Sequence, residues 1–176
     1  MTGKMLIALT MLVMALSCAT SSRQQGKANE QPKGQPPKIV DYYAVDAIRP
    51  GETWKFYLHA EDKDGDMEYI AALMYEPGVG YYPTSTTWLS KEEGRKLEGY
   101  VFLHIPSERN LIGDKVQLTI MIRDRQQNGS QAVRLTLLFK DVPQTPLPEK
   151  WQAAAGNKLG SLSFNLGEST QEIDRE

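Results

Sequence analysis

The chain has 176 residues, with 20 lysines and arginines against 22 aspartates and glutamates, a net charge of −2 and one cysteine. A single cysteine excludes a disulfide within the chain, and the dispersed basic residues of a slightly acidic protein argue against a nucleic-acid partner. The sequence contains neither a G-x-S-x-G motif nor a G-x-x-x-x-G-K-[ST] loop, and we therefore predict no catalytic residue and no enzymatic activity.

The first residues have the pattern of an export signal. Lys4 supplies a positive charge, and Met5 to Leu16 are apolar apart from Thr10. This apolar run suits a signal peptide and is shorter than the roughly 18 residues that a membrane-spanning helix needs. We predict a signal peptide over residues 1–17.

The stretch Ala15-Leu16-Ser17-Cys18 resembles the lipobox of bacterial lipoproteins. The resemblance implies cleavage before Cys18, a diacylglyceryl thioether on its sulfur and an acyl chain on its new amino group. Ala19, where an Asp would imply retention in the inner membrane, implies the outer membrane of the cell envelope. An ordinary secretory signal and an uncleaved membrane anchor are the alternatives for this segment.

The next segment is expected to be a flexible tether over residues 18–38. From Thr20 to Lys38 it has no Val, Ile, Leu, Phe, Tyr or Trp. Such a segment cannot bury enough apolar area to offset the entropy of ordering, so we expect it to be disordered. After a lipidated residue it would hold a domain away from the bilayer.

Residues 39–142 have the length of one domain and alternate between apolar and polar side chains. Alternation with period two is typical of half-buried strands, and we expect strands around residues 54–60, 101–105, 116–123 and 133–139. Turn-like segments such as "DKDGD" and "QQNGSQ" separate them. The motif "SKEE" predicts at most one helical turn, because Gly94 follows it. The pattern favours an all-β, antiparallel β-sandwich.

Three segments give this domain a family resemblance: "HAEDKDGDMEYIAALMY", "TTWLSKEEGRKLEGYVFLHIPSE" and "KVQLTIMIRDRQQNGSQAVRLTLLF". Their order resembles the bacterial immunoglobulin-like and cadherin-like domains of exported proteins. The resemblance implies an immunoglobulin-like sandwich of about seven strands with a binding or spacer role.

The acidic turn after the first of these strands is a candidate metal site. Asp62, Asp64 and Asp66 lie within five residues, and calcium takes six to eight oxygen ligands, often carboxylates. The alternative is a solvated turn in which Gly65 supplies the positive φ. If this turn is a metal site, we expect the ion to be calcium. We expect no other cofactor.

A second candidate site is the Pro- and Gly-rich stretch around Tyr81 and Tyr82, where exposed tyrosines would offer contact area to a partner. Adjacent residues of an extended chain point in opposite directions, so only one of the two rings should be buried. Trp88, in a strand, is expected in the core.

Residues 143–176 are expected to form a Pro-rich C-terminal extension that is partly disordered, with a short helix around "EKWQAAAGN" and a strand around "LGSLSFNLG". We therefore expect a lipid-anchored, non-catalytic binding or structural module of the cell envelope. Its partners would be the membrane and an unidentified envelope protein or polymer. A calcium-dependent adhesion module, or an enzyme with an unrecognised site, is the alternative.

Overall fold

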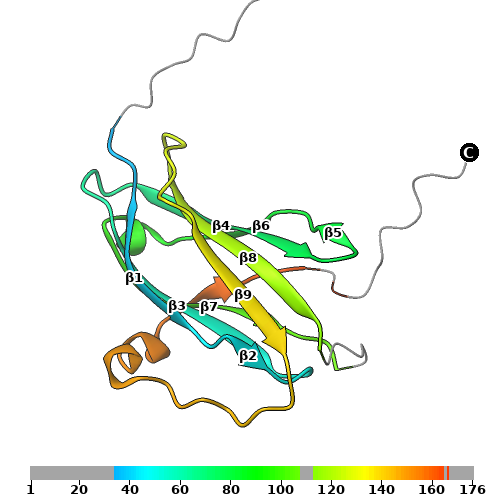
Figure 1. The fold of residues 1–176 in the computed structure, drawn as a ribbon. Helices are drawn as coiled ribbons and strands as arrows, with labels where there is room; N and C mark the ends of the chain where they lie inside the picture. Colours follow the sequence, from blue (N-terminus) through cyan, green and yellow to red (C-terminus); the bar gives the residue numbers. More distant parts are fainter. Residues whose placement is uncertain (1–33, 108–112, 165, 167–176) are drawn as a thin grey trace, which may run out of the picture. The chain divides into compact units, whose positions relative to one another are not determined.

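A computed structural model describes residues 34–107, 113–164 and 166, and they form two β-sheets packed face to face (Figure 1). In order across sheet A, the strands are β1 (Lys38–Ala44), β3 (Thr53–Glu61), β7 (Lys96–His104) and β10 (Lys158–Ser161). In order across sheet B, they are β2 (Ala47–Ile48), β9 (Val133–Phe139), β8 (Lys115–Asp124), β4 (Met67–Glu76) and β5 (Gly80–Tyr81), while β6 (Ser85–Trp88) also pairs with β4.

The predicted alternation is the physical basis of the sandwich. In β3, the side chains of Trp54, Phe56, Leu58 and Ala60 are at most 1% exposed. Inward residues of β4, β7, β8 and β9 meet them in one continuous core. Because each strand buries one face, its register is fixed by the core. All four predicted strands are present, and the predicted immunoglobulin-like β-sandwich is confirmed.

Most neighbouring strands are antiparallel, but two pairs are parallel. The short strand β2 pairs with β9, and β10 pairs with β7. Three 3₁₀ turns, at Lys91–Gly94, Glu149–Trp151 and Ala154–Gly156, complete the secondary structure of the described residues. The first is the expected single turn, where the carboxylate of Glu93 accepts the backbone N–H of Ser90 at 2.7 Å. None of the described helical segments has the length and apolar character needed to cross a bilayer.

The folded unit continues past Val142, the predicted end of the sandwich. The extension runs below the two sheets, forms two 3₁₀ turns and returns as β10 beside β7 (Figure 1). Leu162 and Leu166 are 4% and 2% exposed and belong to the main core. Trp151 forms a second apolar cluster on the outer face of sheet A, with Tyr57, Tyr43, Tyr100, Leu147, Ala154 and Ala155.

A glycine makes room for this extension. A Cβ atom on Gly99 of β7 would lie 2.6 Å from the backbone oxygen of Asn157 and 2.9 Å from the side chain of Leu159. That oxygen accepts the backbone N–H of Tyr100 at 3.0 Å. Only glycine allows the returning chain to approach β7 this closely.

Candidate functional site

The acidic turn between β3 and β4 is organised around Asp62, whose side chain is buried. Its two carboxylate oxygens accept the backbone N–H groups of Asp64 and Asp66 at 3.2 and 2.9 Å. Gly65 has φ +78°, the left-handed conformation that glycine adopts most readily. These contacts are those of a tight turn stabilised by an aspartate.

The same turn brings together the three predicted metal ligands. One carboxylate oxygen from each of Asp62, Asp64 and Asp66 lies within 4.8 Å of the others. Burial raises the pKa of Asp66, and so do its hydrogen bond with Asp62 and the nearby charges of Asp124 and Asp62. The crowding of carboxylates is unfavourable without a cation, but Asp62 already uses both oxygens to hold the turn. The geometry therefore permits calcium and does not require it.

Residues 34–38, expected at the end of the tether, lie against this turn. The backbone N–H of Gln35 donates to Asp64, and β1 begins at Lys38. With the turn and the β8–β9 hairpin they border a cavity of about 890 Å³. The rest of the predicted tether, the predicted signal peptide and Cys18, the predicted lipidation residue, lie outside the described residues.

We expect calcium to leave the melting temperature nearly unchanged, because Asp62 is already engaged by the turn. A specific site at 100 times its dissociation constant would add about 2.7 kcal/mol, or roughly 10 °C for a domain of this size. The measurement is thermal unfolding with calcium and with EDTA. A rise of that size, absent in Asp64→Ala, would contradict this expectation.

The two predicted contact tyrosines differ in burial, as expected from their adjacent positions in an extended chain. Tyr81 is 72% exposed, whereas Tyr82 is 7% exposed. The Tyr82 hydroxyl donates to Glu76 at 2.5 Å, and its ring makes a T-shaped contact with that of Phe164, with centroids 6.3 Å apart. Tyr82 is therefore part of the packing, and only Tyr81 is available to a partner.

The prediction that Trp88 lies in the core is wrong. Its side chain is 65% exposed, because β6 turns Ser85 and Thr87 inward. Ser85 accepts the backbone N–H of Ser163 at 2.9 Å, and Thr87 donates to the carbonyl of Ser161 at 3.0 Å. The returning C-terminal chain thus fixes which side of β6 faces the core.

Trp88 and Tyr81 belong to a larger surface, which we call the aromatic face, on the outer side of sheet B. Residues directly opposite one another in neighbouring strands share a side of the sheet, so the register places them together. Its apolar residues are Tyr69, Ala71, Leu73, Tyr75, Tyr81, Trp88, Met121 and Leu138. Its polar residues are Thr86, Lys115, Gln117, Thr119, Arg123, Arg134 and Thr136.

Two ring pairs mark the ends of this surface. Tyr69 and Trp88 have ring centroids 5.1 Å apart, and Tyr75 and Tyr81 have centroids 4.9 Å apart. Tyr69 and Tyr75 are six residues apart on β4, which is about 20 Å along a strand. The Tyr69 hydroxyl donates to the side chain of Gln127 at 2.9 Å, so this ring is held in place before any partner binds.

The charges of the aromatic face are all positive. Lys115, Arg123 and Arg134 are the ionised residues that the register places there, and none of the paired outward residues is Asp or Glu; Glu68 lies outside the register, at the irregularity between Met67 and Tyr69. The outer face of sheet A differs, because Asp41 and Glu98 lie opposite His59 there. The whole chain has a net charge of −2, so the aromatic face is a local positive region on an acidic protein.

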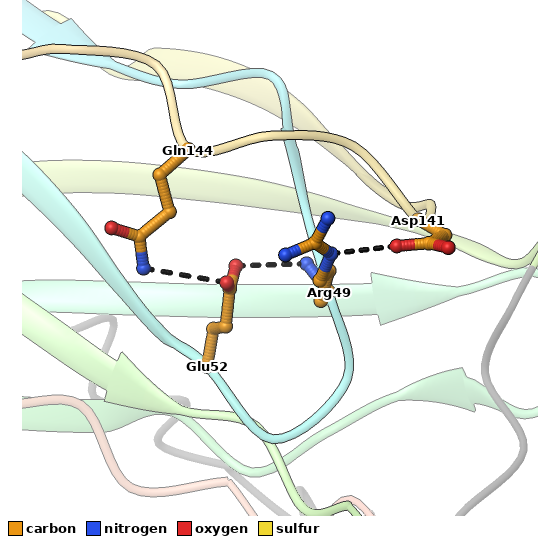
Figure 2. Close-up of polar contacts among 4 residues, drawn as sticks. All are labelled: Arg49, Glu52, Asp141 and Gln144. Carbon is orange, nitrogen blue, oxygen red and sulfur yellow. Dashed lines mark hydrogen bonds and ion pairs between the residues drawn. The ribbon is translucent and has the colours of Figure 1, made fainter.

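Polar contacts fasten the start of the C-terminal extension to the turn before β3 (Figure 2). Arg49 Nε donates to Asp141 at 2.6 Å, and the carboxylate of Glu52 accepts the backbone N–H of Arg49 and the side-chain amide of Gln144. Arg49 and Asp141 are well exposed, and such pairs contribute at most about 1 kcal/mol. Behind these contacts lies a cavity of about 380 Å³ between the extension and strands β2 and β3.

No protein-family model and no curated protein matches the chain. Among solved structures, it is similar to the PKD domain of an M14-like peptidase from a Thermoplasmatales archaeon. The identity is 14%, over 61% of this chain and 99% of that domain, with a TM-score of 0.39. It is also similar to a CARDB domain from Pyrococcus furiosus, solved in complex with di-metal ions. Here the identity is 9%, over 61% of this chain and 90% of that one, with a TM-score of 0.34.

Proposed function

We propose that the protein is a lipid-anchored, non-catalytic module of the bacterial cell envelope that binds a partner through the aromatic face. The observation that carries this proposal is the contrast between the two sheets. On the outer face of sheet A, the tyrosines pack under Trp151 and its neighbours. The outer face of sheet B has Tyr81 and Trp88 exposed at 72% and 65%.

Large exposed aromatic side chains are costly to leave in water, and they are enriched at recognition surfaces. Each exposed ring here rests against a half-buried tyrosine of β4. These contacts restrict the exposed side chains before a partner binds, so binding removes less side-chain entropy. A rigid sandwich with pre-ordered aromatic rings on one face suits a binding module.

The anchor belongs to the same proposal and rests on the sequence. Cys18 would carry the lipid, and the segment that follows it would let the domain reach a partner near the outer membrane. Two or more acyl chains are needed for stable anchoring, since a single chain holds a protein only marginally. In this arrangement the membrane is the first partner and an envelope protein or polymer the second.

The converging carboxylates of Asp62, Asp64 and Asp66 favour a second candidate, a calcium-dependent adhesion module. The two candidates place the functional surface differently, because the acidic turn lies at one end of the sandwich and not on the aromatic face. The calcium melting experiment separates them.

The proposed function is tested by affinity capture from envelope extract with the compact unit Pro32–Glu176, followed by identification of the partner and measurement of its rebinding. We expect Trp88→Ala and Tyr81→Ala to weaken binding about thirtyfold each, the effect of losing a binding hot spot of about 2 kcal/mol. Tyr42→Ala, which removes a 44% exposed ring from β1, should bind like wild type.

The anchor is tested in whole cells, where Cys18→Ser should abolish palmitate labelling and release the protein from membranes. Undiminished labelling of Cys18→Ser would overturn the proposed lipid anchor. Wild-type binding by both Trp88→Ala and Tyr81→Ala would overturn the proposed role of the aromatic face.

A further inference from the structure

The chemistry of the aromatic face narrows the class of its partner. Lys115, Arg123 and Arg134 carry positive charge, and no carboxylate accompanies them in the register of this face. Two copies of the chain packed through this face would bring like charges together, which disfavours self-association. The charge pattern is complementary to an anionic partner.

The distribution of the neutral polar residues argues against a lipid surface. Thr119 and Gln117 lie opposite Leu73 and Tyr75, so hydrogen-bonding groups alternate with apolar ones across the face. Insertion of the rings into a bilayer would draw these groups out of water without giving them partners, which costs free energy. A partner with its own hydroxyl groups would satisfy them.

The shape of the aromatic face suits an extended partner. The cavities of about 890 Å³ and 380 Å³ described above lie elsewhere on the sandwich. The aromatic face has two ring pairs about 20 Å apart along β4, and the small and apolar residues Ala71 and Leu73 lie between them.

We propose that the aromatic face binds an extended anionic polysaccharide, an inference that rests on the proposed function and names its partner class. The C–H groups on one side of a sugar ring carry partial positive charge and are attracted to the negative face of an aromatic ring. The two ring pairs hold sugar units at the two ends of the face. Gln117 and Thr119 bond to hydroxyl groups, and Arg134 and Arg123 pair with the carboxylates of the polymer.

The probe is polygalacturonate, a uronate polymer, compared with neutral pullulan, and the protein is the compact unit Pro32–Glu176. Binding is measured by calorimetry and by retardation in gels that contain the polymer. We expect wild type to bind polygalacturonate, and Trp88→Ala to weaken binding about thirtyfold. Arg134→Gln should weaken it about fivefold, as the loss of an exposed ion pair does, and should reduce its dependence on salt.

Two variants control for the loss of an exposed ring or charge elsewhere. Tyr42→Ala removes a ring from β1, and Arg125→Gln removes a charge from the exposed part of the β8–β9 hairpin; both should bind like wild type. Thermal unfolding of each variant confirms that it folds, and Tyr81→Ala provides a second test of the ring pairs.

The inference is overturned if polygalacturonate binds no better than pullulan, or if binding survives both Trp88→Ala and Arg134→Gln. Binding to vesicles of phosphatidylglycerol and phosphatidylcholine that depends on these residues, with no binding to the polymer, would identify a lipid surface instead. Capture of an envelope protein that depends on Trp88, again without polymer binding, would refute the polysaccharide and leave the binding module intact.

Discussion

A chain that ends at Val142 should fail to unfold cooperatively, although it retains strands β1 to β9. It would lack Leu162 and Leu166, which are at most 4% exposed in the main core, and Trp151, which covers Tyr57. Removing a buried leucine side chain costs about 2–5 kcal/mol, and a buried tryptophan about 3–5 kcal/mol. Together these losses, about 7–15 kcal/mol, are as large as the 5–15 kcal/mol that stabilises a typical domain.

The matched control is a chain that ends at Leu166, which keeps every described residue of the extension. It should unfold at the same urea concentration as the unit Pro32–Glu176. Tryptophan fluorescence and far-ultraviolet circular dichroism, followed against urea, would report both chains. If the chain that ends at Val142 unfolded at the same urea concentration as the longer one, the C-terminal extension would contribute nothing to the stability of the sandwich.

The sandwich itself could be predicted because its strands carry a local signal. In β3 and β8, every second side chain is apolar, and the same residues are those that the core buries. The acidic turn was predictable for a similar reason. Asp62 and Gly65 make their turn contacts within five residues of one another, so their chemistry can be read without knowing the fold.

The extension carries no such signal. Trp151, Leu162 and Leu166 are spaced irregularly, and each contacts a part of the chain far away in the sequence. The type of Gly99 does report this contact, since glycine inside a strand often marks the close approach of another backbone. That signal locates a close contact but does not identify the segment that makes it.

The aromatic face was missed because the orientation of β6 depends on the extension. The size of Trp88 favoured burial, but Ser85 and Thr87 face inward to bond with residues 161–163. Without β10, the sequence offers no reason to place two polar residues on the core side of a strand. The ring pairs, which need the register of β4 with β5 and β6, follow only from the folded chain.

Trp151→Ala should lower the free energy of unfolding by about 3–5 kcal/mol, the usual cost of removing a buried tryptophan. Trp151 is 3% exposed, and its ring centroid lies 6.2 Å from that of Tyr57. Burial under this cluster raises the pKa of Tyr57, with smaller contributions from Tyr100 and Tyr43. Exposure of Tyr57 in the variant should therefore bring its pKa back toward the ordinary value, which spectrophotometric titration of the tyrosines would detect.

Two further substitutions separate the apolar packing of Trp151 from the effects of its own indole N–H and of the neighbouring Lys150. The indole N–H is buried without a hydrogen-bond partner among the described residues, so Trp151→Phe removes an unsatisfied donor and keeps most of the apolar contact. It should cost less than half as much as the alanine variant. Lys150→Ala removes the exposed pair with Asp41 at 3.0 Å and should cost at most about 1 kcal/mol. If Trp151→Ala were no more costly than Lys150→Ala, the cluster on sheet A would not be what holds the extension in place, and Leu162 and Leu166 alone would have to do so.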